Sequence, residues 1–233
     1  MSDIVKIHTT HREIKTRRNE GNSTVSAKIW RELARPIHQM SRRLTVKPRP
    51  ESPYLTGSGA SIAGFHPQQA TVEAEGIPLI RKLVHESANF PGPIIEIGTL
   101  LGITTTTIAL AKQPTQKVIT VDLYCWNPWG LDPVVHEDLT AEMLRYLVDT
   151  GHVERIRMDK NQFFDSYHGP APSLVFLDAI HDYPETKKDI EWAKRIGAKI
   201  IAGHDYCDAF KGVMQVVDEF GGPRDLAGSV WAL

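Results

Sequence analysis

Short apolar runs alternate with helix-length amphipathic segments from residue 70 to the end of the sequence. Apolar runs that end in glycine or an acidic residue are typical of strands buried on both sides. The pattern predicts strands at 94–98, 117–122, 153–158, 173–178, 199–203 and 228–233. Apolar residues at steps of three and four predict helices at about 70–89, 102–112, 134–150, 161–167, 184–196 and 209–220.

Strands separated by helices favour right-handed crossovers and a sheet covered on both faces. We therefore predict an α/β fold, a Rossmann-like, doubly wound and mostly parallel sheet, for a domain spanning 70–233. In such sheets a ligand binds beyond the carboxyl ends of the strands, where the strand order reverses.

Residues 1–69 have a different pattern and are predicted to form an N-terminal extension. Residues 25–44 can form an amphipathic helix, and 45–69 hold four prolines and three glycines, which predicts a loop or lid.

Charge is distributed unevenly along the 233 residues, although the net charge is only −1. Residues 1–50 carry 12 Lys and Arg against 4 Asp and Glu, whereas the remaining residues carry 15 against 24. The basic segment could bind RNA, an acidic lipid or an acidic partner. No aromatic residues are interleaved for base stacking, so we favour a segment that folds over the acidic body of its own or a neighbouring subunit. The extension is thus also a candidate contact for a homo-oligomer.

Cysteine content and hydropathy point to a cytoplasmic protein. The sequence has no apolar run of the length needed to span a membrane and no apolar core of a signal peptide at residues 1–15. Cys125 and Cys207 suggest neither a disulfide framework nor zinc spacing.

The stretch from Pro93 to Gly102 predicts a ligand cradle. It reads as a buried strand that enters a glycine-punctuated turn before a threonine-rich helix. Gly98 lets the backbone turn sharply and approach a ligand, and the helix after Gly102 would direct its N–H groups into the turn. Glu96 is expected to be a fixed acceptor at the lip of this cradle.

Every predicted parallel strand carries an acidic residue at its carboxyl end, which core packing does not require. These ends carry Glu96, Asp122, Asp159 with Lys160 and Asn161, Asp178, and His204 with Asp205. Asp159 could equally cap the following helix. Asp122 lies 24 residues after Gly98, a spacing that suits an acceptor for both ribose hydroxyls of an adenosine ligand. The turn is Gly-x-x-x-Gly, which disfavours a dinucleotide.

Four motifs in order resemble the class I S-adenosylmethionine-dependent methyltransferases over about 70–233. They are Glu96-Ile97-Gly98-Thr99-x-x-Gly102, then Val121-Asp122, then the segment from Phe176 to Tyr183, then the segment from Ile201 to Tyr206. Within that superfamily the sequence looks closest to small-molecule and sugar O-methyltransferases.

The resemblance implies roles for the strand-end residues. Glu96, Gly98, Thr99 and Gly102 would shape the cofactor cradle, Asp122 would hold the ribose, and Asp159 and Asn161 would lie beside the adenine. In members similar to catechol O-methyltransferases, the positions of Asp178, His204 and Asp205 bind Mg²⁺. His181 stands where those members have a lysine general base, and an imidazole can take a hydroxyl proton near neutral pH.

The resemblance therefore implies methyl transfer to a hydroxyl of a small-molecule or sugar-like acceptor, with no nucleic-acid or membrane partner. A divalent metal, with Mg²⁺ the leading candidate, would assist. His204 and Asp205 could instead only orient the substrate.

Other readings stay open. They are an NAD(P)-dependent oxidoreductase, an RNA or protein methyltransferase that uses the basic arm, and a non-catalytic adenosine-binding module.

Three further expectations concern the outer parts of the domain. The aromatic insertion at 123–133, with Trp126 and Trp129, could wall an acceptor pocket or simply pack onto the body. His136, His152 and His168 are expected at the surface. Related folds end in a two-stranded hairpin, so the single strand at 228–233 implies either a very tight hairpin or a missing strand.

Overall fold

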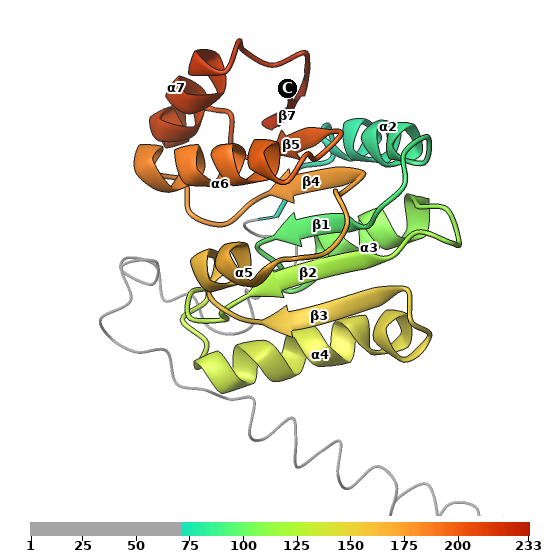
Figure 1. Cartoon of the computed structure of the whole chain (residues 1–233). Helices are drawn as coiled ribbons and strands as arrows, with labels where there is room; N and C mark the ends of the chain where they lie inside the picture. The colour runs from blue at the N-terminus through green and yellow to red at the C-terminus, as the bar shows by residue number, and fades with distance from the viewer. Residues whose placement is uncertain (1–70) are drawn as a thin grey trace, which may run out of the picture. The chain divides into compact units, whose positions relative to one another are not determined.

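Figure 1 shows a computed structural model of the chain, which describes residues 71–233. The predicted extension at 1–69, with its helix, its loop and its basic charges, lies outside the described residues.

One seven-stranded sheet forms the centre of the described domain, in the order β3-β2-β1-β4-β5-β7-β6. Strands β1 to β5 pair in parallel, whereas β7 runs antiparallel to both β5 and β6. The order reverses between β1 and β4, which is where the fold is expected to bind a ligand. The strand bounds are β1 Ile94–Ile97, β2 Val118–Asp122, β3 Val153–Arg157, β4 Leu174–Leu177, β5 Ile201–Gly203, β6 Asp225–Ala227 and β7 Val230–Ala232.

Helices cover both faces of the sheet, as Figure 1 shows, and this confirms the predicted α/β class. Helices α2, α3 and α4 pack on one face, and α5, α6 and α7 pack on the other. The bounds are α2 Ile77–Ser87, α3 Ile103–Ala111, α4 Pro133–Asp149, α5 Lys160–Ser166, α6 Tyr183–Arg195 and α7 Lys211–Glu219.

Strand residues alternate between the two cores. In β1, Ile94 joins the core under α2 to α4, whereas Ile95 and Ile97 join the core under α5 to α7. Because successive side chains of a strand point to opposite faces, a strand covered on both sides must be apolar at almost every position. The uninterrupted apolar runs in the sequence therefore have a direct structural cause.

Two predicted elements differ from those observed. Helix α2 begins at Ile77 and not near residue 70, because Gly76 is its N-cap and Pro78 occupies its first turn. The predicted last helix is divided into a 3₁₀ turn, Asp208–Phe210, and α7.

The C-terminal residues of the domain form a very tight hairpin. Strands β6 and β7 pair antiparallel around Gly228 and Ser229, and Gly228 has a φ of 56°. Two-residue hairpin turns favour residues that tolerate positive φ, which glycine does. The first of the two predicted alternatives, a very tight hairpin, is therefore confirmed: β7 lies within the predicted strand at 228–233 and pairs with β6. None of the described helices is both long and apolar enough to cross a membrane.

Candidate active site

A pocket of about 140 Å³ lies at the carboxyl edge of the parallel strands. Gly98, Asp122, Asp159 and Asp178 all line it, one at or just beyond the carboxyl end of each of the first four strands. An adjoining smaller pocket is lined by Gly98, Asp178 and Thr99. The fold thus gathers most of the predicted cofactor residues at one place. Three other predicted residues, Glu96, Gly102 and Asn161, do not appear in the described lining of either pocket.

The glycine turn has the backbone geometry that the sequence predicts. Gly98 has a φ of 100°, and a Cβ at this position would lie 1.8 Å from the carbonyl oxygen of Asp178. Gly102 is the N-cap of α3 with a φ of 80°, and a Cβ there would press into Leu144. Glycine is therefore required at both positions, because a side chain would clash and the conformation is left-handed.

Asp122 organises this turn from the end of β2. Its Oδ2 accepts hydrogen bonds from the backbone N–H of Thr99 at 2.8 Å and of Leu100 at 2.9 Å. Its Oδ1 accepts one from the N–H of Tyr124 at 2.7 Å. A carboxylate oxygen can accept about two hydrogen bonds, so Oδ1 keeps one acceptor position for a ligand.

Leu100 is held in an unusual conformation by side chains from α4. Its φ is 48°, and its carbonyl oxygen lies 2.6 Å from the Thr140 hydroxyl and 3.0 Å from Nε2 of His136. The expectation that His136 lies at the surface is wrong, because its side chain is fully buried. His168 is exposed as expected, and His152 is half-buried. Burial lowers the pKa of His136, so the neutral ring donates its Nε2 proton to Leu100.

Glu96 supports the turn from inside the protein. The prediction that it lies at the lip of the cradle is wrong, because it is fully buried on the α3 side of β1. Its Oε2 accepts hydrogen bonds from the hydroxyls of Thr105 and Thr120, each at 2.5 Å, and its Oε1 has no partner among residues 71–233. Burial raises the pKa of Glu96 to about 8, against the opposing effect of the two hydroxyls. The Thr120 hydroxyl also lies 2.6 Å from that of Thr99, which links this buried acid to the glycine turn.

Asp159 both caps α5 and borders the pocket. Its carboxylate accepts hydrogen bonds from the N–H of Asn161 at 2.9 Å and of Gln162 at 3.3 Å. The Asn161 side chain lies away from the pocket and donates to Glu185 at 3.3 Å. Lys160, which the sequence places at the same strand end, lines the pocket next to Asp159. It is only 6% exposed and forms a buried ion pair with Asp189.

The aromatic insertion is divided between two roles. Trp126 lines the pocket, together with Leu123 and Cys125, so this part walls the candidate ligand site. Tyr124 is fully buried and packs edge-on against His136 at 5.3 Å between ring centroids. Trp129 is not part of the described pocket lining.

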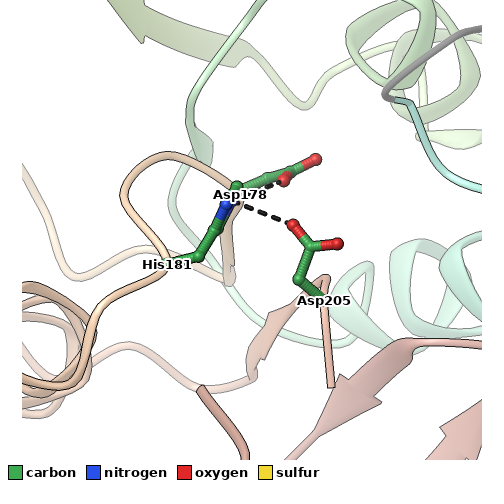
Figure 2. Close-up of side chains that lie close together, drawn as sticks. All are labelled: Asp178, His181 and Asp205. Atoms are coloured by element: carbon green, nitrogen blue, oxygen red, sulfur yellow. Dashed lines mark ion pairs between the residues drawn. The ribbon is translucent and has the colours of Figure 1, made fainter. Parts of the chain in front are cut away.

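A second group of polar side chains begins at Asp178, where the pocket ends. Figure 2 shows Asp178, His181 and Asp205 converging, from the loop after β4 and the end of β5. Nε2 of His181 lies 3.5 Å from Oδ1 of Asp178 and 2.9 Å from Oδ2 of Asp205. Asp205 has a φ of 64°, a conformation that non-glycine residues adopt mainly where function or surrounding structure requires it.

His204 adjoins this group from the buried side. Its Nδ1 lies 3.5 Å from Oδ1 of Asp178 and 3.4 Å from Oδ1 of Asp205. Its Nε2 lies 2.8 Å from Oε2 of Glu73. Sequence reasoning missed Glu73, and no local signal could have found it, since it lies 131 residues from His204 in the chain.

The charges of this site are strongly coupled. Burial alone would lower the pKa of His181, but Asp178 and Asp205 outweigh it and raise that pKa to about 9. For His204 burial is likewise outweighed, by Asp178 first and then by Asp205 and Glu73, and its pKa rises to about 10. Both imidazoles are therefore protonated at neutral pH in the absence of a cation.

The donor set fits a divalent cation. Among the described residues, Asp178, His181 and Asp205 offer ligand atoms that lie within 4.8 Å of one another. Within the part of the chain that the structure describes, Nε2 of His181 is buried without a hydrogen-bond partner, because its close approach to Asp205 lacks hydrogen-bond geometry. Two carboxylates and an imidazole suit Mn²⁺ and similar ions, whereas Mg²⁺ prefers oxygen ligands. The geometry brings His181 into this set, whereas the sequence pattern predicted Asp178, His204 and Asp205.

Comparison with known proteins agrees with this geometry. Residues 95–206 match a family model described as a methyltransferase domain. The sequence over these residues is thus similar to a methyltransferase domain. None of the curated proteins matches this sequence.

Solved structures resemble the described domain in fold. A protein from Klebsiella pneumoniae assigned as an O-methyltransferase superposes with a TM-score of 0.51 at 22% identity, over 66% of this chain and 70% of that one. An O-methyltransferase from Bacillus cereus in complex with SAH gives 0.50 at 18%, over 66% and 71%. The calicheamicin methyltransferase CalS11 gives 0.51 at 14%, over 67% and 77%. At these identities the likeness concerns the fold.

Proposed function

We propose that the protein transfers a methyl group from S-adenosylmethionine to a hydroxyl of a small-molecule or sugar-like acceptor. One observation carries this proposal: Asp178 lines the pocket beside the glycine turn and also belongs to the cluster with His181 and Asp205. A methyl donor in the pocket would thus have an acid–base and cation-binding group as its direct neighbour, as a two-substrate transfer requires.

The methyl donor would occupy the pocket between Gly98 and Asp159. The glycine turn lets the donor approach the backbone closely, and the free acceptor position on Asp122 suits a ribose hydroxyl. Asp159 can accept from an adenine amino group, while it keeps its cap hydrogen bonds to α5. Leu100 and Trp126 supply apolar surface for the nucleoside.

Asp178 and Asp205 would hold a divalent cation together with His204, whose Nδ1 lies 3.5 and 3.4 Å from the two carboxylates. This leaves His181 for proton transfer. When bound, the cation would orient the acceptor oxygen and lower the pKa of its hydroxyl. The carboxylates that now keep His181 protonated would then share their charge with the cation, so the imidazole would lose its proton more readily.

His181 would then act as the general base. It would take the hydroxyl proton at Nε2 while the acceptor oxygen attacks the methyl carbon of the sulfonium in line. The oxygen–carbon bond forms as the carbon–sulfur bond breaks, and S-adenosylhomocysteine leaves. Catalysis would come mainly from positioning the two reactants.

Isothermal titration with S-adenosylmethionine and with NAD tests the donor. We expect S-adenosylmethionine to bind with a dissociation constant in the micromolar range and NAD not to bind. Binding of NAD without S-adenosylmethionine would refute the proposal in favour of an oxidoreductase.

A panel of phenols, catechols and glycosides, incubated with methyl-labelled S-adenosylmethionine, tests the acceptor class. We expect label in at least one hydroxyl compound and loss of transfer on addition of a chelator. Transfer that is unaffected by the chelator would remove the cation from the proposal.

Two variants separate the roles of the histidines. If His181 is the base, His181→Ala should lower the rate about 100-fold and abolish the acid limb of the pH–rate profile, with Mn²⁺ affinity little changed. If His181 is instead a ligand, its loss should weaken Mn²⁺ binding more than His204→Ala does. An unchanged pH–rate profile in His181→Ala would reassign the base.

A further inference from the structure

Glu73 lies between the first described residues and α2, in a segment without helical structure. Its carboxylate has an extensive set of contacts for a residue that is only partly buried. Oε2 lies 2.8 Å from Nε2 of His204, and both oxygens accept from the hydroxyl of Ser229, at 2.9 and 3.1 Å. The N–H of Ser229 donates to Oε1 as well. Glu73 therefore joins the start of the domain to the C-terminal hairpin and to His204.

The surrounding structure is shaped to hold this carboxylate. Gly228 sits directly against it, and a Cβ at Gly228 would lie 2.0 Å from Oε1 of Glu73. The neighbouring Val72 is buried, and a Cβ at Gly76 would clash with Val230 of the hairpin. A longer or mobile side chain could not occupy this space without moving the tight turn between β6 and β7.

The same hairpin fixes the backbone around His204. The carbonyl of Ser229 accepts from the N–H of Tyr206 at 3.0 Å, and Nε1 of Trp231 donates to the carbonyl of His204 at 2.9 Å. Backbone and imidazole of His204 are thus held by one structural unit that includes Glu73.

We infer that Glu73 is a positioning residue of the acceptor site that acts through His204. Because the carboxylate takes Nε2, the ring presents Nδ1 to Oδ1 of Asp178 and Oδ1 of Asp205, at 3.5 and 3.4 Å. An imidazole that faces a cation site is commonly oriented by a carboxylate on its other nitrogen. Without Glu73 the His204 ring loses the partner that fixes its orientation. Asp178 and Asp205 then lose the buried imidazole that holds their carboxylates in place.

This inference rests on the proposed function, because the positioned carboxylates are those of the proposed cation site. Its test uses Glu73→Gln, which keeps the size of the side chain, and Glu73→Ala. Glu75→Gln is the matched control, since Glu75 belongs to the same segment and is exposed. The full chain is used throughout, and thermal unfolding shows whether each variant is folded.

Three readouts decide the outcome. In Glu73→Gln we expect the affinity for S-adenosylmethionine to stay within about two-fold and the affinity for Mn²⁺ to fall by about ten-fold or more, the usual effect of losing an orienting partner. The ring N–H resonance of His204 in histidine-labelled protein, assigned with His204→Gln, should shift in Glu73→Gln but not in Glu75→Gln.

Unchanged Mn²⁺ affinity in both Glu73 variants would overturn the inference, even if S-adenosylmethionine and the cation bind as proposed. If the wild-type protein binds S-adenosylmethionine but no Mn²⁺, the proposed cation is refuted. Positioning by Glu73 then stands or falls on the His204 resonance. Glu73→Gln keeps the test decisive if Glu73→Ala does not fold.

Discussion

Replacing Glu96 by glutamine should change how the stability of this protein depends on pH. Glu96 is fully buried in β1, and its pKa is raised by burial from 4.5 to about 8. Between these values the folded protein keeps a proton that the unfolded chain releases. The stability contribution of Glu96 is therefore full below pH 4.5 and is lost as the pH rises towards 8.

The size of the effect follows from the shift. Each pH unit in this window costs about 1.4 kcal/mol, so the whole shift amounts to roughly 5 kcal/mol. Glutamine cannot ionise, and its carbonyl can still accept from Thr105 and Thr120. Its amide would leave a buried donor unpaired, which costs about 1–3 kcal/mol at every pH. The variant should thus be less stable than wild type near pH 5, and this deficit should shrink or reverse by about 3 kcal/mol near pH 7.5.

Urea unfolding at a series of pH values measures this difference directly. Both proteins share every other titrating group, so those contributions cancel when the two stability curves are subtracted. Glu142→Gln is the control, because its carboxylate is 57% exposed. Stability curves for wild type and Glu96→Gln that run parallel from about pH 5 to pH 8 would refute the argument, because Glu96 would then be ionised in the folded state.

Three further changes test the cradle. Gly98→Ala should abolish binding of S-adenosylmethionine in calorimetry, because its Cβ would lie 1.8 Å from the carbonyl of Asp178; binding near wild-type strength would contradict the close approach. Thr140→Val removes one of two hydrogen bonds to the carbonyl of Leu100 and should weaken that binding about five-fold; unchanged affinity would mean that the remaining bond suffices. Asp159→Asn keeps a helix cap, so thermal unfolding should be unchanged while binding of S-adenosylmethionine weakens about ten-fold. A loss of stability without a loss of binding would mean that Asp159 acts only as the cap of α5.

The sequence determined the order of elements and the edge of the sheet that carries the site. Apolar runs and helical spacing extend over a few neighbouring residues, so they can be recognised in the sequence alone. A parallel sheet with crossovers then places every strand's carboxyl end at one edge. For this reason Gly98, Asp122, Asp159 and Asp178 could be predicted as neighbours without knowledge of any contact.

Local chemistry also limited what could be predicted. The start of α2 and the hairpin after α7 depend on Gly76 and Gly228. Hydrophobic periodicity does not locate element ends that single glycines set. The hairpin was expected to be very tight or incomplete, and the pairing of β6 with β7 decided between the two.

Only the tertiary structure decided which side chains of the site support one another. His136 looked like a surface residue, but α4 packs it beneath Leu100. Glu96 looked like an open acceptor, but the cover of α3 over β1 buries it and raises its pKa. The contact between Glu73 and His204 joins residues 131 apart in sequence. Such contacts depend on how helices and strands far apart in the chain are packed, and a displacement of a few ångströms would remove them. Local patterns carry no information on that scale, so protonation and support within the site could be read only from the folded domain.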